Sequence, residues 1–319
     1  MYKKISIFFI WIIIFIFVDS IILRGIFHLG YPVYYTYNGS ARDPKPYFEF
    51  MREGMSTQTS LDKENFFKDA KKGDIKVVFF GGSTGEVLSS KLFQEKLSKY
   101  FAQPVSFLNL SCISANHRQH LHMILEVLPK YNPDIIIFYG GYNETVQGIF
   151  YDPRPGYPFN FFYKGEVSSL GKFLVEYSAL FGALEYKYNI FSPLEKLKAE
   201  YNPLSPEWNK SIEDKYFETI YLSKKVSEVL KSDKYGHTRF IAFYQPYQIR
   251  EIPEFANTNK DIRNRIKKID YIYDIYDAYS SFGDGVWDDI CHVKKNSGAN
   301  EYIIDLMSKI VANKYNLKK

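Results

Sequence analysis

The segment Ile75-Lys76-Val77-Val78-Phe79-Phe80-Gly81-Gly82-Ser83-Thr84-Gly85-Glu86 decides the fold of this chain. Its first six residues are mostly apolar, which is typical of a buried strand. The glycine pair favours a tight turn, and the amphipathic stretch that follows predicts a helix. We therefore expect Ser83 at the carboxyl end of a strand, beside the unpaired N–H groups and the positive dipole end of a helix.

Apolar runs and amphipathic segments alternate on both sides of this segment in the manner of βαβ units. Predicted helices contain apolar residues at helical spacing across 88–101, 121–128 and 303–311. Continuous apolar runs suit strands that are buried on both faces of a parallel sheet; they are Val105–Leu108, Ile135–Tyr139, Phe240–Tyr244 and Tyr271–Tyr273. The pattern predicts an α/β fold: a doubly wound, flavodoxin-like parallel sheet flanked by helices, whose ligands bind at the carboxyl ends of the strands.

The composition narrows the classes of function. The 319 residues are 46% hydrophobic, which is enough for a large buried core. The net charge of +5 comes from 41 basic and 36 acidic residues, and no basic block occurs. Nucleic acid is therefore not an expected partner.

The N-terminus predicts a membrane anchor. Ile5–Leu23 is apolar except for Ser6, Asp19 and Ser20. Nineteen helical residues span about 28 Å, close to the hydrocarbon thickness of a bilayer. A cleaved signal peptide is the alternative, but the sequence offers no small-x-small cleavage site. Lys3 and Lys4 favour a cytoplasmic N-terminus, which would place the remainder of the chain outside the cytoplasmic membrane.

We expect three parts in the chain: a transmembrane anchor over 1–24, a polar connector over 25–74 and a catalytic domain over 75–319. The last contains an aromatic-rich insertion at about 145–212, in which Leu170–Tyr188 predicts an amphipathic helix. An ordinary subdomain on the sheet, a lid over the site and a membrane-contacting surface are the interpretations open for this insertion.

A second motif supplies what Ser83 needs to act as a nucleophile. In Asp289-Ile290-Cys291-His292 a carboxylate precedes an imidazole by three residues. The imidazole of His292 can take a serine proton, and Asp289 can orient the ring. Asp284 and Asp288 are alternative carboxylates, and helix capping, with Glu86 in a capping box, is the alternative role of Ser83. A P-loop is not supported, because no Lys follows the turn.

Two further segments each follow a predicted strand: Asn109-Leu110-Ser111-Cys112-Ile113-Ser114-Ala115-Asn116 and Gly140-Gly141-Tyr142-Asn143-Glu144. In order, the four segments resemble the four sequence blocks of the SGNH (GDSL-like) hydrolases, and the resemblance covers about residues 75–315. It implies Ser83, Asp289 and His292 as catalytic residues. It also implies an oxyanion hole made by the backbone N–H groups of Ser83 and Ser114 and the side chain of Asn143. Ser114 stands where the family usually has Gly, and Glu144 where Asp usually follows the Asn.

The resemblance implies acyl-ester chemistry through an acyl-serine intermediate, without a metal or organic cofactor. We expect an esterase or O-acyltransferase of the membrane-anchored bacterial type that acts on O-acylated cell-envelope polysaccharide, with a membrane-bound acyl donor as a candidate partner. A lipase or lysophospholipase acting on a lipid ester is one alternative. A catalytically inactive module that binds polysaccharide or an assembly partner is the other, because Ser114 lacks the backbone freedom of glycine.

Two other groups of residues attract attention. His117, His120 and His122 lack a Cys or carboxylate in ligand spacing, so we expect a polar helix start rather than a metal site. Cys112 and Cys291 lie in the second and fourth blocks, and we expect two buried free thiols rather than a disulfide.

Overall fold

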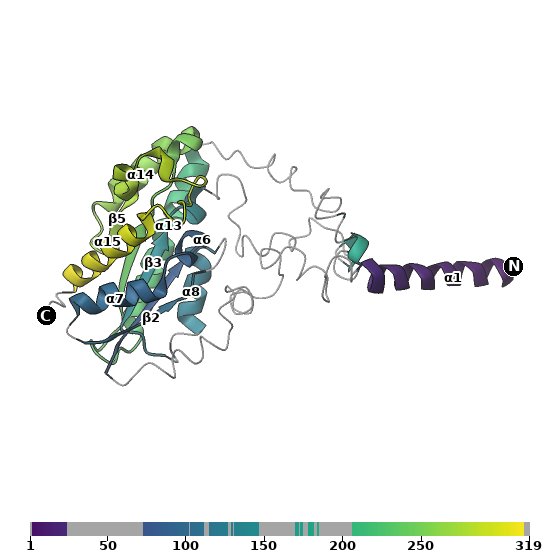
Figure 1. Cartoon of the computed structure of the whole chain (residues 1–319), viewed down its shortest axis with the longest axis horizontal. Helices are drawn as coiled ribbons and strands as arrows, with labels where there is room; N and C mark the ends of the chain where they lie inside the picture. The colour runs from purple at the N-terminus through teal and green to yellow at the C-terminus, as the bar shows by residue number, and fades with distance from the viewer. Residues whose placement is uncertain are drawn as a thin grey trace. The chain divides into compact units, whose positions relative to one another are not determined.

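The computed structural model describes residues 2–23, 73–101, 103–111, 115–126, 129, 131–146, short pieces between 170 and 184, and 206–315 (Figure 1). The chain divides into two compact units. One comprises Met1–Phe50 with Arg154–Tyr201, and the other Met51–Pro153 with Asn202–Lys319. The predicted strands and all the described candidate site residues belong to the second unit.

The second unit is built on a five-stranded, all-parallel sheet with the order β2-β1-β3-β4-β5. This order confirms the predicted doubly wound, flavodoxin-like sheet. The chain reverses its direction of winding between β1 and β3, and ligands of such sheets bind beside this switch point. The strands are β1 (Ile75–Gly81), β2 (Val105–Asn109), β3 (Ile135–Gly140), β4 (Arg239–Tyr244) and β5 (Ile272–Asp274).

Helices cover both faces of the sheet (Figure 1). On one face α7 (Ser90–Tyr100) packs beside α15 (Ala299–Lys314). On the other, α13 (Pro206–Val229) contacts α8 (His117–Glu126), α14 (Ala256–Ile266) and β4. Both faces are thus covered, which explains why the strands read as continuous apolar runs.

Alternating strand residues supply the two halves of the core. Phe79 of β1 packs against Phe93 of α7, with 5.2 Å between ring centroids, and belongs to the cluster that contains Met307 of α15. Its neighbour Phe80 faces the opposite side, where its ring lies 5.2 Å from that of His120 in α8. Each fully buried aromatic side chain contributes roughly 1.5–3 kcal/mol of hydrophobic free energy, so these pairs fix the sheet between its helical layers.

A long helix begins within the region predicted as the insertion. Helix α13 begins at Pro206, so residues 206–212 belong to the helix that connects β3 to β4. Proline at the start of a helix lacks only an N–H that would be unpaired there anyway, so it marks this boundary. Most of 145–205, most of the predicted helix Leu170–Tyr188 and nearly all of the connector 25–74 lie outside the described residues.

The N-terminal segment differs from the single predicted helix. The α-helix α1 spans Tyr2–Phe17, and Val18–Leu23 continues it as a π-helix. Among the described residues, no helix combines the length and the apolar character needed to cross a membrane. The geometry changes next to Asp19, a buried residue whose carboxylate accepts hydrogen bonds from Ser178 Oγ (3.0 Å), Ala179 N (3.2 Å) and Leu180 N (2.8 Å).

Candidate active site

Ser83 begins the short helix α6 (Ser83–Glu86), directly after β1. The backbone N–H groups of Gly85 and Glu86 both donate to the Gly82 carbonyl at 3.0 Å, which makes Gly82 the N-cap residue. Ser83 is therefore the first residue of the helix rather than its cap, so its hydroxyl is not used in capping. A Cβ at Gly85 would lie 2.7 Å from Ser111 Oγ, which shows how tightly this turn packs.

The loop that carries Asp289 and His292 is a narrow, hydrogen-bonded turn. An isolated antiparallel bridge joins Trp287 to Val293, and Asp288 N donates to the His292 carbonyl at 2.9 Å. Within the turn, Asp289 Oδ1 accepts the backbone N–H groups of Cys291 and His292, both at 2.8 Å. These local bonds fix the carboxylate relative to the following ring.

The turn brings His292 against Ser83, 209 residues away in the sequence. Asp289 Oδ2 lies 2.7 Å from His292 Nδ1, and His292 Nε2 lies 2.8 Å from Ser83 Oγ. The His292 side chain is 29% exposed and that of Asp289 55%. The three side chains thus form one hydrogen-bonded chain at the carboxyl end of the sheet, within reach of solvent.

The alternative carboxylates lie elsewhere. Asp284 Oδ2 pairs with Arg250 Nη1 at 2.5 Å, and the described contact of Asp288 with the turn is made by its backbone. The carboxylate in contact with the His292 ring is that of Asp289.

The electrostatics of Asp289 set the tautomer of His292. Partial burial works to raise the pKa of the Asp289 carboxyl, but the N–H groups of Cys291 and His292 and the imidazole outweigh it and hold the pKa below its usual range. The ionised carboxylate can only accept hydrogen bonds, so His292 Nδ1 must carry the proton. Nε2 of the neutral ring is then a lone-pair acceptor that faces the Ser83 hydroxyl.

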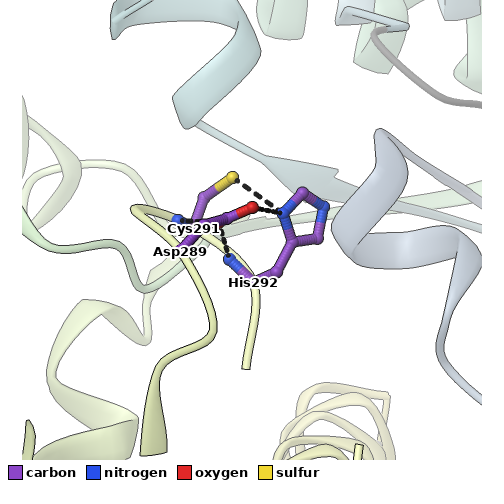
Figure 2. Close-up of side chains that lie close together, drawn as sticks. All are labelled: Asp289, Cys291 and His292. Carbon is purple, nitrogen blue, oxygen red and sulfur yellow. Dashed lines mark hydrogen bonds and ion pairs between the residues drawn. The ribbon is translucent and has the colours of Figure 1, made fainter. Parts of the chain in front are cut away.

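Asp289, Cys291 and His292 also lie close enough together to resemble a metal-binding group, with ligand atoms within 4.8 Å of one another (Figure 2). Burial raises the pKa of the Cys291 thiol, whereas a metal would need the thiolate. Asp289 already accepts hydrogen bonds on both oxygens, from the backbone and from His292. This chemistry suits the orientation of an imidazole better than the binding of a cation.

Cys291 is a buried thiol in the turn that carries Asp289 and His292. Its sulfur lies 3.5 Å from His292 Nδ1. Cys112 lies outside the described residues, so the structure does not test the predicted absence of a disulfide between the two cysteines.

Asn143 lies in a π-helical turn, Tyr142–Val146, directly after β3. Its Nδ2 donates to the Ala115 carbonyl at 2.8 Å. A Cβ placed on Gly82 would lie only 2.3 Å from the same nitrogen, so the amide of Asn143 packs against the backbone that leads into Ser83. Ser114, the other predicted donor, lies outside the described residues.

His117 and His120 occur at the start of α8, as predicted, but they are buried rather than part of a polar surface. Their Nδ1 atoms lie 3.2 Å apart. Burial lowers the pKa of His120 to about 3 and also lowers that of His117 well below its usual value. Neutral imidazoles pack well among aromatic rings, which explains how these polar residues enter the core; the side chain of His122 lies outside the described residues.

Two glutamines that we did not predict from the sequence support the site. Gln248 donates from Nε2 to the Asp289 carbonyl and from its backbone N to the Ile290 carbonyl, both at 2.8 Å. Gln245 Oε1 accepts from Thr84 Oγ1 at 3.2 Å, next to Ser83. Both glutamines follow β4, and a polar residue after a strand is too common to be a signal by itself.

No protein-family model and no curated protein matches the chain. Similar solved structures include the acetyl xylan esterase AlAXEase, with 14% identity over 74% of this chain and 100% of that one and a TM-score of 0.41. A candidate acylhydrolase, BF3764 from Bacteroides fragilis NCTC 9343, has 13% identity over 79% and 94% of the two chains and a TM-score of 0.43.

A candidate GDSL-like lipase from Parabacteroides merdae ATCC 43184 is similar at 10% identity over 74% of this chain and 97% of that one, with a TM-score of 0.38.

Proposed function

We propose that this protein is an SGNH-type serine esterase or O-acyltransferase in which Ser83 forms the acyl-enzyme. The observation that carries the proposal is the chain of hydrogen bonds from Asp289 through His292 to Ser83. It has the order and the distances of a nucleophile, its general base and the group that orients the base.

The chemistry follows from these contacts. Ser83 Oγ bonds to the ester carbonyl carbon while its proton passes to His292 Nε2, and the carbonyl oxygen becomes an oxyanion. The ester C–O bond then breaks, and His292 returns the proton to the leaving alcohol. A water or an acceptor alcohol next gives its proton to His292 and attacks the acyl carbon. The bond between the acyl carbon and Ser83 Oγ then breaks, and His292 returns the proton to Ser83 Oγ.

The oxyanion needs donors close to Ser83. The backbone N–H of Ser83 lies at the start of α6, where helix N–H groups lack partners within the helix. The amide of Asn143 lies beside Gly82. We propose these two groups, together with the N–H of Ser114, as the oxyanion hole. Donors preorganised in this way act mainly on the transition state.

We further propose that the enzyme acts outside the cytoplasmic membrane on O-acylated cell-envelope polysaccharide. Support comes from the apolar run Ile5–Leu23 and from the exposed apolar side chains of α1, such as Trp11 at 65% exposure. The partial exposure of Asp289 and His292 is compatible with a large polymeric substrate. Transfer to an acceptor alcohol and hydrolysis by water share the same acyl-enzyme, so the acceptor decides between them.

Replacement of Ser83 tests the proposed nucleophile. A fluorophosphonate probe should label the wild-type protein and lose all labelling in Ser83→Ala, together with cleavage of p-nitrophenyl acetate, because the attacking oxygen is gone. Ser90→Ala, in the first turn of α7, is the matched control and should label normally. Intact-mass measurement of the wild type with ester should show one added acyl group.

Normal labelling of Ser83→Ala would place the nucleophile elsewhere. A wild-type protein that resists the probe but binds acetylated glycans would instead be a binding module without turnover.

A further inference from the structure

The side chain of Glu144 joins two loops that meet beside Ser83. Its Oε2 accepts the backbone N–H of Gly141 at 2.6 Å, and its Oε1 accepts the backbone N–H of His117 at 3.0 Å. Gly141 follows β3, whereas His117 begins α8. One carboxylate therefore ties the turn after β3 to the start of the neighbouring helix.

Asn143 makes a second tie between the same two segments. Its Nδ2 donates to the carbonyl of Ala115, two residues before the His117 N–H that Glu144 accepts. Asn143 and Glu144 are adjacent in one π-helical turn, Tyr142–Val146. A shift of the Glu144 carboxylate would consequently move the backbone from which the Asn143 amide projects.

The surroundings of Glu144 restrict its movement. Its side chain is only 6% exposed, and Oε1 also lies 3.2 Å from Nδ1 of the buried His117 ring. Gly140 leaves just enough room, since a Cβ there would lie 2.8 Å from Glu144 Oε2 and 2.7 Å from His117 Cε1. The carboxylate is therefore enclosed between the His117 ring and the backbone of Gly140.

We propose that Glu144 is a positioning residue of the oxyanion hole, which acts by holding the turn that carries Asn143 against α8. This inference rests on the proposed function. It adds to that function a role for Glu144, which follows the proposed oxyanion donor Asn143 in the chain and acts without contact to a reacting atom. This role requires a side chain with two acceptor oxygens, because the backbone N–H groups of His117 and Gly141 each donate to one of them.

Glu144→Gln keeps the shape of the side chain but leaves one acceptor oxygen for two backbone donors. Ester hydrolysis by the full-length chain should show a kcat that falls by about 10- to 100-fold with little change in KM, since displaced catalytic groups lose rate at this scale. A double-mutant cycle with Asn143→Ala gives the decisive readout. In the Asn143→Ala background the same Glu144→Gln change should alter kcat by less than about twofold, because Glu144 acts through Asn143.

Controls separate this role from a general structural one. Glu301→Gln changes an exposed carboxylate on α15, a helix that packs beside α7 and not against either loop segment, and should leave kcat unchanged. Thermal unfolding shows whether each variant is folded. Should Glu144→Gln fail to fold, Glu144→Asp, which retains two acceptor oxygens on a shorter stem, carries the same cycle with Asn143→Ala.

The outcomes are distinguishable. Loss of kcat in the wild-type background and none in the Asn143→Ala background supports the positioning role. An equal loss in both backgrounds, a loss confined to KM, or no loss at all overturns that role while Ser83-dependent activity stands. A wild-type protein without any Ser83-dependent activity overturns the proposed function and this inference together.

Discussion

Asn143 is placed by two contacts of opposite kind: a hydrogen bond to the Ala115 carbonyl and close packing against Gly82. The first uses one of the two amide hydrogens, and the second brings the nitrogen beside the backbone that enters α6. Because Gly82 has no side chain, the amide can approach this backbone closely. The position suits a donor to an oxyanion formed on a Ser83 adduct.

Replacement of Asn143 by Ala should lower kcat for ester hydrolysis by about 10²–10³, or about 2.7–4 kcal/mol, because a lost oxyanion donor acts in the transition state. KM should change little. Steady-state kinetics on p-nitrophenyl acetate measure both constants, with Asn313→Ala on the exposed side of α15 as the matched control. A loss confined to KM would make Asn143 a substrate-binding residue instead.

At the scale of elements, the start of α8 and the turn after β3 share a buried titratable cluster. Burial raises the pKa of Glu144 to about 7, although the N–H groups of Gly141 and His117 oppose this rise. Burial lowers the pKa of His120 to about 3 and that of His117 well below 6.5, and the neighbouring His120 adds to the latter shift. The aromatic ring of Tyr216 from α13 also faces His117. The cluster links α8, α13 and β3 electrostatically.

These shifts predict how the free energy of unfolding depends on pH. Below about pH 6.5 the histidines of the unfolded chain bind protons, whereas the buried rings of the folded chain stay neutral. The free energy of unfolding therefore decreases as pH falls. Glu144 acts in the opposite direction. Its contribution is complete below its ordinary pKa of 4.5 and is lost as pH rises through about 7. Two histidines outweigh one glutamate, and the net effect is a loss of stability from pH 6.5 to 4.5.

Glu144→Gln removes the opposing contribution, so its stability should fall more steeply than that of the wild type between pH 6.5 and 4.5. Urea unfolding at four pH values in this range measures the slope, and Glu301→Gln on the exposed side of α15 serves as the control that should follow the wild type. Equal slopes for Glu144→Gln and wild type would show that Glu144 does not hold its proton in this range.

At the scale of the whole molecule, the chain leaves the sheet after β3 and returns to it at α13. The sheet, its covering helices and the described site residues form one unit, and Arg154–Tyr201 clusters with Met1–Phe50 in the other. Within the unit that contains Met1–Phe50, Asp19 accepts hydrogen bonds from Ser178, Ala179 and Leu180. The segment inserted between β3 and α13 thus contacts the N-terminal helix, some 160 residues earlier in the chain.

The apolar N-terminal segment leads to a topological prediction. In bacterial cells the full-length protein should stay in the membrane fraction after a high-salt wash, and protease added to spheroplasts should digest the chain beyond residue 30. Ile13→Arg should shift the protein toward the soluble fraction, because a central arginine costs about 2.5–3.5 kcal/mol on membrane-insertion scales. Ile7→Leu is the matched control. Protection of the chain in intact spheroplasts would contradict the extracytoplasmic placement.

Much of the fold follows from local patterns. Each strand of the sheet appears in the sequence as an apolar run, and the helices α7, α8 and α15 appear as amphipathic periods. The sequence also indicated the residues of the site, because the Gly-Gly-Ser turn and the Asp-x-x-His spacing each occupy a few consecutive positions. Helices α13 and α14 were not predicted; α13 begins within the region assigned to the aromatic-rich insertion.

The sequence by itself determined the α/β class, the strands of the sheet and the residues at the ends of β1 and β3. Hydrophobic periodicity and turn preferences act over a few residues, so they can be recognised in a short stretch of sequence. Only the tertiary structure decided that His292 meets Ser83, that Asp289 rather than Asp284 contacts the ring, and that Glu144 joins two loops. Those contacts depend on the register of parallel strands and on how loops pack at one sheet edge, which couples residues far apart in the chain.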